Sequence, residues 1–407
     1  MRIHSYTAKS TQTVAVLFGG PSFEHEISIL TGVFVLNVLK RSPYEILPVY
    51  IDTAGEFYTS PDMFDVKNFL PEKRKKFTKI AFGKNAVYPF EKKRKPLAQL
   101  YCAFNCCHGG WGEGGGVSAL MEVYGIPLVS PDTALSALFM DKLRSKPLLM
   151  GMGIPCVRYV GLREGEFSED KTGNIEKIEA QMGYPVIVKP ARLGSSIGVG
   201  VARERAELIT ALETAFSFDG SALIEEYLPD KRDINCAAYS VDGEIVVSDC
   251  QQPVSQEEIF SFREKYLADG KISAKNSPPP LPEGVEKQIK EITKTLYKTL
   301  QFTGMVRADF LLSGDKVYFN EMNTVPGSLA YYLFSEKLLS ARKIFCELIE
   351  DAVQRAKKEK KRFFLHLHFK PSGLCLGKES GQIVPRIQAQ KCRYSGVNAC
   401  KRENFLL

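Results

Sequence analysis

Four polar side chains occupy alternate positions in the hairpin sequence RADFLLSGDKVYFNEMNTVPG. Arg307 and Asp309 are two residues apart on the first strand, so they share one face. Glu321 and Asn323 repeat this spacing on the second strand. A three-residue turn at 313–315 would place all four groups on one side, with the acids diagonal to each other, whereas a two-residue turn would separate the acids. Two carboxylates and an amide oxygen suit Mg²⁺ held beside substrate phosphates, although a charged surface with a salt bridge would give the same pattern.

A second candidate is the loop KPARLGSSIGVG at 189–200. Lys189 ends an apolar strand, which favours an anionic partner. Gly194, Ser195 and Ser196 supply backbone N–H groups and hydroxyls of the kind that form phosphate-binding nests. The Walker loop and the dinucleotide-binding fingerprint are both absent from the sequence. A glycine–serine turn of purely structural meaning fits the same residues.

Two further motifs follow apolar strands. GGPSFEHEIS at 19–28 contains Glu24, and HGGWGEGG at 108–115 contains His108 and Glu113. Ligands of open α/β sheets bind outside the carboxyl ends of the strands. These three side chains are therefore expected near one site.

The order of the elements predicts an α/β domain at 13–135. Apolar strands at 13–20, 44–52 and 100–107 alternate with helical patterns, which favours a parallel sheet. The basic stretch 57–98 interrupts this alternation and is expected to be a surface insertion.

Residues 136–228 predict a second unit of mixed α+β character. The strand at 184–190 is followed by its expected hairpin partner at 195–202. IEEYL at 224–228, together with Asp233, offers acceptors for adenine amino and ribose hydroxyl groups, although exposed acids are common.

Residues 229–357 predict a third unit. It contains a hairpin at 234–249, a helix at 283–300, the hairpin with the candidate metal ligands (called the metal-type hairpin below) and a helix at 338–356. Residues 358–407 lack clear periodicity, so we expect a disordered or peripheral tail.

Composition excludes several classes of protein. The chain has 407 residues, a net charge of +7 and ten cysteines without a C-x-x-C pair, which favours reduced thiols in a cytoplasmic protein. No apolar run approaches the roughly 18–20 residues of a membrane helix. The basic clusters lack interleaved aromatic residues and zinc patterns, so neither a nucleic-acid partner nor a membrane is expected.

Eight short segments are informative because they occur in a fixed order along the chain. They are GGPSFEHEIS, HGGWGEGG, MDK, VKPARLGSSIGV, IEEYL, EKY, RADF and NEMNTVPG. In this order they resemble the D-alanine–D-alanine ligases of the ATP-grasp superfamily, over about residues 13–357. The resemblance implies an ATP-grasp fold with an N-terminal parallel-sheet domain, a central antiparallel-sheet subdomain and a C-terminal mixed domain. It also implies a possible homodimer.

The resemblance implies a reaction as well. ATP phosphorylates the carboxylate of a first D-alanine, the amine of a second D-alanine attacks the acyl phosphate, and phosphate leaves. ATP and Mg²⁺ or Mn²⁺ are the implied cofactors, and the product would serve peptidoglycan synthesis.

Site residues follow from the matching positions. Asp309, Glu321 and Asn323 resemble the metal ligands. The implied nucleotide contacts are Lys142, Lys189, Ser196, Glu225, Tyr227, Leu228, Asp233 and Lys265. The implied substrate and intermediate contacts are Glu24 for the first ammonium, Ser195 for orientation, Arg307 and the Gly327 backbone for the oxyanion, and Tyr266 in a mobile loop.

Some positions depart from the family pattern, and the acceptor therefore stays open. Tyr332 stands where many members have a serine that holds the second substrate's carboxylate, and Asp233 is shorter than the usual glutamate. Tyr266 favours an amine acceptor, which leaves D-alanine, D-serine or another amino acid. A nucleotide-binding protein without ligase activity is the alternative of another class.

Overall fold

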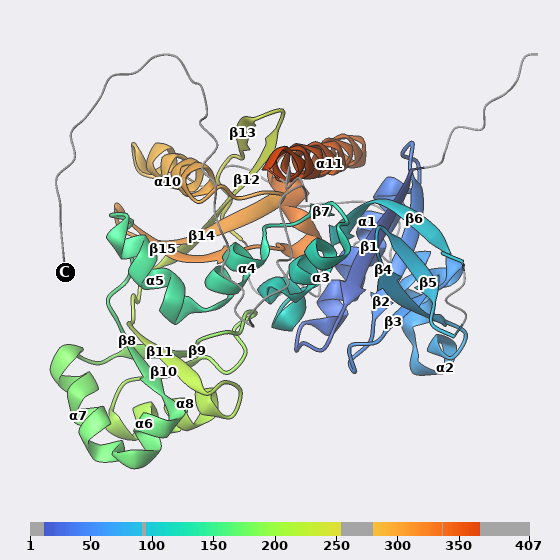
Figure 1. Cartoon of the computed structure of the whole chain (residues 1–407). Helices are drawn as coiled ribbons and strands as arrows, with labels where there is room; N and C mark the ends of the chain where they lie inside the picture. The colour runs from blue at the N-terminus through green and yellow to red at the C-terminus, as the bar shows by residue number, and fades with distance from the viewer. Residues whose placement is uncertain (1–11, 92–94, 254–279, 336, 367–407) are drawn as a thin grey trace, which may run out of the picture. The chain divides into compact units, whose positions relative to one another are not determined.

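The computed structural model describes residues 12–91, 95–253, 280–335 and 337–366, and its elements are arranged around three sheets (Figure 1). The first sheet has seven strands in the order β1-β2-β3-β4-β5-β6-β7, and β6 returns to pair with β1. The other two sheets have four strands each, in the orders β10-β9-β11-β8 and β13-β12-β14-β15. The α/β and α+β character predicted from the sequence is confirmed.

The first sheet begins with an apolar strand whose seven residues are all buried, as expected for a strand covered on both faces. Its parallel strands are β1 (Thr13–Gly19), β2 (Glu45–Ile51), β6 (Ala98–Asn105) and β7 (Leu128–Val129). Its antiparallel strands are β3 (Phe57–Thr59), β4 (Thr78–Gly83) and β5 (Ala86–Pro89). Three short strands within the stretch 57–98 are therefore part of the sheet, so the prediction that the whole stretch is a surface insertion is wrong.

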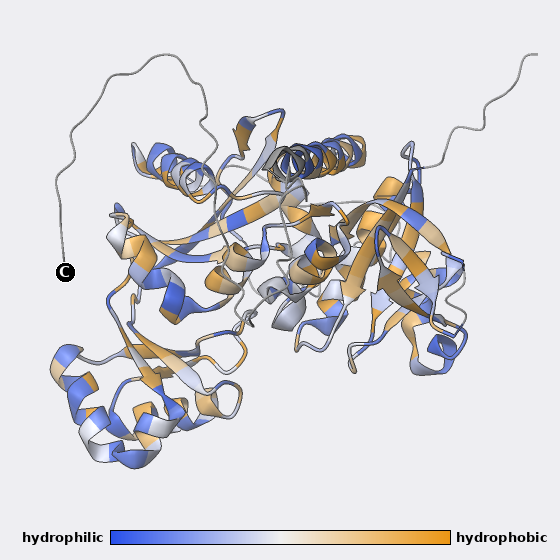
Figure 2. Ribbon diagram, in the orientation of Figure 1, coloured by the Kyte–Doolittle hydropathy of each residue, from blue (hydrophilic) through white to orange (hydrophobic). Residues whose placement is uncertain are grey.

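Helices and short turns accompany this sheet. Helix α1 (His25–Leu39) packs its buried residues into the same core as β1, and strands and helix are both coloured hydrophobic in Figure 2. The remaining elements are η1 (Pro61–Phe64), η2 (Val66–Phe69), α2 (Pro71–Arg74), η3 (Gly112–Gly116) and α3 (Val117–Tyr124).

The central sheet is antiparallel throughout. Its strands are β8 (Tyr159–Arg163), β9 (Val186–Pro190), β10 (Gly200–Ala202) and β11 (Ser221–Glu226). Strand β10 pairs with β9 across the glycine–serine loop, so the predicted hairpin pairing is confirmed, although the strand covers only 200–202 of the predicted 195–202. Helices α6 (Glu164–Glu169), α7 (Lys171–Gln181) and α8 (Arg205–Phe216) contribute to a core of their own with this sheet.

The third sheet carries the metal-type hairpin. Its strands are β12 (Arg232–Val241), β13 (Glu244–Val247), β14 (Met305–Ser313) and β15 (Lys316–Asn323). Helices α4 (Thr133–Met140), α5 (Lys142–Gly151) and α10 (Val285–Thr299) share its core. Helix α11 (Leu338–His366) extends beyond the predicted boundary at 357 and packs with α1 in the first core. The short turn η4 (Gly327–Leu333) follows β15.

The turn of the β14–β15 hairpin differs from the expectation. Ser313 pairs with Lys316, so the turn has two residues, Gly314 and Asp315. Gly314 has φ of +61°, a left-handed conformation that glycine adopts without a steric penalty. A regular ladder from this turn would place the two acids on opposite faces.

A β-bulge corrects the register. Phe310 pairs with Phe319, but Asp309 pairs with Glu321, so Asn320 is an extra residue in β15. The two acids therefore lie directly opposite each other rather than diagonally. The conclusion that they share one side holds, but the three-residue turn on which it was based does not exist.

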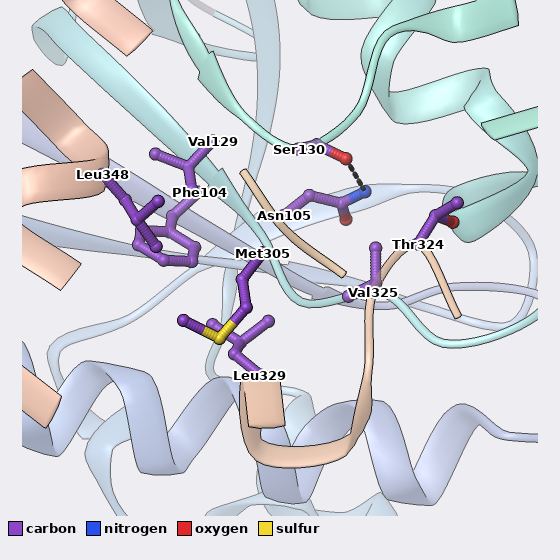
Figure 3. A pocket seen from close by; sticks show the side chains of 9 residues that line it. All are labelled: Phe104, Asn105, Val129, Ser130, Met305, Thr324, Val325, Leu329 and Leu348. Carbon is purple, nitrogen blue, oxygen red and sulfur yellow. Dashed lines mark hydrogen bonds between the residues drawn. The ribbon is translucent and has the colours of Figure 1, made fainter. Parts of the chain in front are cut away.

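A small cavity lies between the first and third sheets. This cavity of about 10 Å³, close to the space that a single water molecule needs, is lined by Val325 among other residues, and Figure 3 shows the side chains around it. Met305 and Leu329 lie against it, and Asn105 donates a hydrogen bond to Ser130 on its polar side. The turn after β15 therefore packs against side chains of β6 and β14. Within the described residues, no helix is both long and apolar enough to cross a membrane.

Candidate active site

Glu24 lies at the start of α1, just after the glycine turn that ends β1. Its backbone carbonyl accepts from Ser28 in the first turn of the helix, and its carboxylate accepts a hydrogen bond from the Ser195 hydroxyl. Burial raises the pKa of Glu24, and the Ser195 hydrogen bond opposes this shift. The Glu321 carboxylate raises the same pKa further and the Lys142 ammonium lowers it. Residues from three regions of the chain therefore act on one carboxylate.

Glu113 joins the loop after β6 to the turn after β15. Its carboxylate accepts from the Gly109 N–H at 2.8 Å and from the Val325 N–H at 3.2 Å. Burial raises the pKa of Glu113 to about 7 against these hydrogen bonds, and Glu24 adds to the rise. His108 is buried beside it, with Nε2 2.8 Å from the Thr31 hydroxyl, and burial lowers its pKa to about 4. Both side chains thus hold the loops around the site in place.

Among the three predicted metal ligands, Asp309 accepts several side-chain hydrogen bonds. The Arg307 guanidinium donates two hydrogen bonds to it, at 2.7 and 2.8 Å, and the Asn323 amide donates a third at 2.9 Å. Burial raises the pKa of Asp309, the Arg307 charge opposes the rise, and the facing Glu321 carboxylate adds to it. The two acids and the amide are thus close neighbours.

Lys142 ties this set to the glycine–serine loop. It is the first residue of α5, and its Nζ lies 3.2 Å from a Glu321 oxygen and 2.6 Å from the Leu193 carbonyl. Its backbone N–H also donates to the Ala191 carbonyl. Burial raises the pKa of Glu321, but Lys142 and Lys189 outweigh it, so the net direction is downward. Glu321 therefore stays ionised among cations.

The glycine–serine loop has an unusual backbone. Ser195 and Ser196 have φ of +51° and +58°, in the left-handed region that non-glycine residues seldom adopt. Asp219 holds the base of the loop by accepting from the Arg192 backbone at 2.8 Å and from its guanidinium at 2.6 Å. Both serine side chains are exposed. The loop thus extends from a fixed base and brings the Ser195 hydroxyl to the Glu24 carboxylate.

A buried group of charges lies beside this loop. The Glu225 carboxylate pairs with Lys189 at 2.6 Å and with Lys146 at 2.6 Å. Lys189 also donates to the Asn320 side chain at 3.2 Å, which connects it to the bulge in β15. The central and third sheets therefore meet through these polar contacts.

Other predicted residues are less closely engaged. Asp233 is half exposed and pairs with Lys231 at 2.7 Å, although its charge contributes to the raised pKa of Lys189. Tyr227 and Leu228 follow β11 and are partly buried. Three further predicted positions complete the set: Gly327 begins η4, and Lys265 and Tyr266 lie outside the described residues.

Sequence reasoning missed two residues of this region. Lys146 lies four residues after Lys142 on α5, and this spacing puts both ammonium groups on one helix face, a signal that could have identified it. Asn320 had no such signal, because its position depends on the bulge. Tyr332, which had been noted as a departure, has its hydroxyl 3.4 Å from an Arg307 nitrogen.

No cluster of three or more His, Cys, Asp or Glu side chains suited to a metal occurs in the part of the chain that the structure describes. The candidate metal set is therefore two acids and an amide. With Lys189 on the central antiparallel sheet, Lys142 at the start of α5 and the acids on the hairpin of the third sheet, the arrangement is that of an ATP-grasp enzyme.

Comparison with known proteins specifies the family. The sequence profile of the D-ala D-ala ligase N-terminus matches residues 13–131, and that of the D-ala D-ala ligase C-terminus matches residues 148–354. The chain belongs to the D-alanine–D-alanine ligase family, whose members are ATP-dependent ligases that form a peptide bond.

Individual relatives agree with this assignment. The chain is 34% identical over 355 residues to the D-alanine–D-alanine ligase of Thermosipho melanesiensis, covering 85% of this chain and 95% of the relative. The crystal structure of the Helicobacter pylori D-alanine–D-alanine ligase has a TM-score of 0.67 at 29% identity, covering 83% and 98%. The VanG D-Ala:D-Ser ligase of Enterococcus faecalis also has a TM-score of 0.67, at 26% identity, covering 85% and 99%.

Proposed function

We propose that this protein joins two molecules of D-alanine into D-alanyl-D-alanine for peptidoglycan synthesis. ATP would phosphorylate the carboxylate of the first D-alanine, and the amine of the second would attack the acyl phosphate and release phosphate. The observation that carries the proposal is the facing pair Asp309 and Glu321, joined through Lys142 to the serine loop. The family assignment agrees with this chemistry.

The proposed roles at the amino-acid substrates follow from charge and position. Glu24 would bind the ammonium group of the first D-alanine, and Ser195, which already donates to Glu24, would orient that substrate. Arg307 and the Gly327 N–H would stabilise the negative charge of the tetrahedral intermediate. Tyr266 would belong to the loop that closes over the site.

The proposed nucleotide contacts divide into phosphate and adenosine groups. Lys142 and Lys189 would bind phosphate oxygens beside the loop of Ser196, and Lys265 would join them on closure. The adenosine contacts would be Glu225, Tyr227, Leu228 and Asp233.

Asp309, Glu321 and Asn323 fit Mg²⁺ because they supply two partly buried carboxylates on paired positions and an amide oxygen. Bound there, Mg²⁺ would neutralise charge that develops on the transferred phosphoryl group. Mn²⁺ suits the same oxygen ligands. Lys142, which pairs with Glu321, would hold that carboxylate ionised and oriented.

Homodimerisation and a cytoplasmic location remain predictions from the family and from the sequence. A cytoplasmic location would supply the ATP that the reaction consumes. Sedimentation of the purified protein would test the dimer.

A second candidate function differs only in the acceptor. The similarity to a D-Ala:D-Ser ligase and the presence of Tyr332 beside Arg307 favour testing D-serine. The direct test is mass spectrometry of products formed from ATP, Mg²⁺ and a panel of D-amino acids. D-Alanyl-D-alanine as the main product supports the first proposal, and D-alanyl-D-serine supports the second. Nucleotide binding without any dipeptide would reject both.

The metal assignment has its own test. Glu321→Gln keeps the size of the side chain but removes a ligand charge, so we expect turnover to fall at least about 100-fold. Binding of Mn²⁺, followed by electron paramagnetic resonance, should weaken in parallel. An unchanged turnover number in this variant would remove Glu321 from the metal site.

A further inference from the structure

Lys146 has no role in the proposal above, yet it is more deeply buried than Lys142 and Lys189. Its side chain is 1% exposed, and its Nζ lies 2.6 Å from a Glu225 oxygen on a side chain that is 2% exposed. The ammonium also lies 5.5 Å from the centre of the Tyr159 ring. Burying an ammonium is costly unless a partner charge compensates for it, so its presence calls for an explanation.

Glu225 shares its charge between two lysines. Its Oε1 contacts Lys146, and its Oε2 contacts Lys189 at the same distance of 2.6 Å. Burial raises the pKa of Glu225, but the two ammonium groups outweigh it and hold the value at about 2. The carboxylate is therefore ionised at neutral pH, and the group of two lysines and one carboxylate has one net positive charge.

This net charge matters at Lys189. A lysine ammonium has three N–H donors, and contacts with Glu225 and Asn320 account for two of them. A phosphate oxygen can take the third. If Lys146 were neutral, Glu225 would cancel the charge of Lys189, and the attraction for phosphate would fall.

We propose that Lys146 is a positioning residue for nucleotide binding, which holds Glu225 in place and preserves the positive charge of Lys189 for the phosphates. This inference rests on the proposed function, because it takes Lys189 as a phosphate contact. Lys146 acts through Glu225 and does not touch the nucleotide.

Lys146→Met tests the inference because it removes the charge and keeps an unbranched apolar stem of similar length. We expect the Kd for ADP with Mg²⁺, measured by titration calorimetry, to rise about tenfold. The KM for D-alanine should stay within about twofold. Lys171→Met is the matched control, since Lys171 pairs with Glu213 at 2.7 Å on an exposed part of the same unit, and its Kd for ADP should not change.

The double variant Lys146→Met/Glu225→Gln separates charge from packing. Glu225→Gln keeps an oxygen that can accept from adenine but removes the negative charge, which restores the positive charge at Lys189, so the double variant should bind ADP more tightly than Lys146→Met alone. Wild-type ADP binding in Lys146→Met, or a double variant no better than the single one, would overturn the inference. If Lys146→Met does not fold, Lys146→Gln, which also removes the charge but keeps a polar end beside Glu225, should show the same loss of ADP affinity, and wild-type affinity there would also overturn the inference.

Failure of the proposed function can be distinguished from failure of the inference about Lys146. ADP binding is measured without D-alanine, so absence of a dipeptide product would reject the reaction but leave the effect of Lys146 measurable.

Discussion

At the scale of single residues, the contact between Tyr332 and Arg307 links the tyrosine to the proposed oxyanion site. The hydroxyl lies 3.4 Å from the guanidinium, so it helps to orient the cation assigned to the intermediate. Tyr332→Phe removes only this hydroxyl. We expect kcat to fall about three- to tenfold, the effect of one lost hydrogen bond, with the acceptor KM unchanged. A higher acceptor KM at constant kcat would instead assign the hydroxyl to the second amino acid.

Glu113 gives a residue-scale prediction for stability. Its pKa of about 7 in the folded protein lies above the ordinary value of 4.5. Between these values the unfolded chain releases the proton first, so its stabilising contribution is complete below pH 4.5 and is lost as pH rises through about 7. Glu113→Gln removes this titration.

Urea unfolding at pH 5 and pH 8 checks the prediction. The wild type should lose stability relative to Glu113→Gln on going from pH 5 to pH 8, by on the order of 3 kcal/mol at most. An equal difference between the two proteins at both pH values would contradict the assigned pKa.

The residue types in the sequence predicted which side chains belong to the site, but they did not predict the contacts between these side chains. Glu24, Ser195, Lys142 and Glu321 were identified from motifs, and the structure connects them through hydrogen bonds, an ion pair and electrostatic coupling. Lys146 was missed because a lysine within a helix usually faces solvent. Its spacing from Lys142 indicates a shared helix face, but its burial depends on tertiary packing.

At the scale of elements, the β14–β15 hairpin shows where sequence reasoning ends. Alternation predicted which residues share a face, but the relation between the strands depends on the turn and on any bulge. Asn320 as an extra residue is set by packing across two sheets rather than by local propensity. The prediction for 57–98 was wrong for a similar reason. The short strands of this segment are stabilised by pairing in the sheet, and their own hydrophobic pattern is weak.

The turn after β6 gives a prediction at this scale. Gly109 has φ of +63°, and a Cβ there would lie 2.6 Å from a Glu24 oxygen. Gly109→Ala should therefore strain the backbone and displace Glu24, lowering kcat/KM for D-alanine about thirtyfold or more.

Gly55→Ala is the control for this variant. Gly55 has φ of +82° with nothing within 4 Å of its Cβ position, so it carries similar backbone strain away from the site. Its activity should match the wild type. Equal activity of Gly109→Ala and the wild type would show that Glu24 does not need its present position.

At the scale of the whole molecule, contacts between distant segments assemble the site. Glu350 on α11 accepts hydrogen bonds from Tyr44 and Tyr101 beside the first sheet, and Glu113 joins that sheet to the turn after β15. The order of the motifs predicted the ATP-grasp fold and the family. It could not predict these long-range contacts, because each joins residues more than 200 positions apart.

Transfer of isotopic oxygen tests the central claim, which is that ATP activates a D-alanine carboxylate. D-Alanine labelled with ¹⁸O in its carboxylate would be incubated with ATP, Mg²⁺ and the enzyme, and the released phosphate would be analysed by mass spectrometry. An acyl phosphate predicts one labelled oxygen in each phosphate released with a dipeptide, because the carboxylate oxygen that attacks phosphorus leaves with it. Dipeptide formation with unlabelled phosphate would contradict the account.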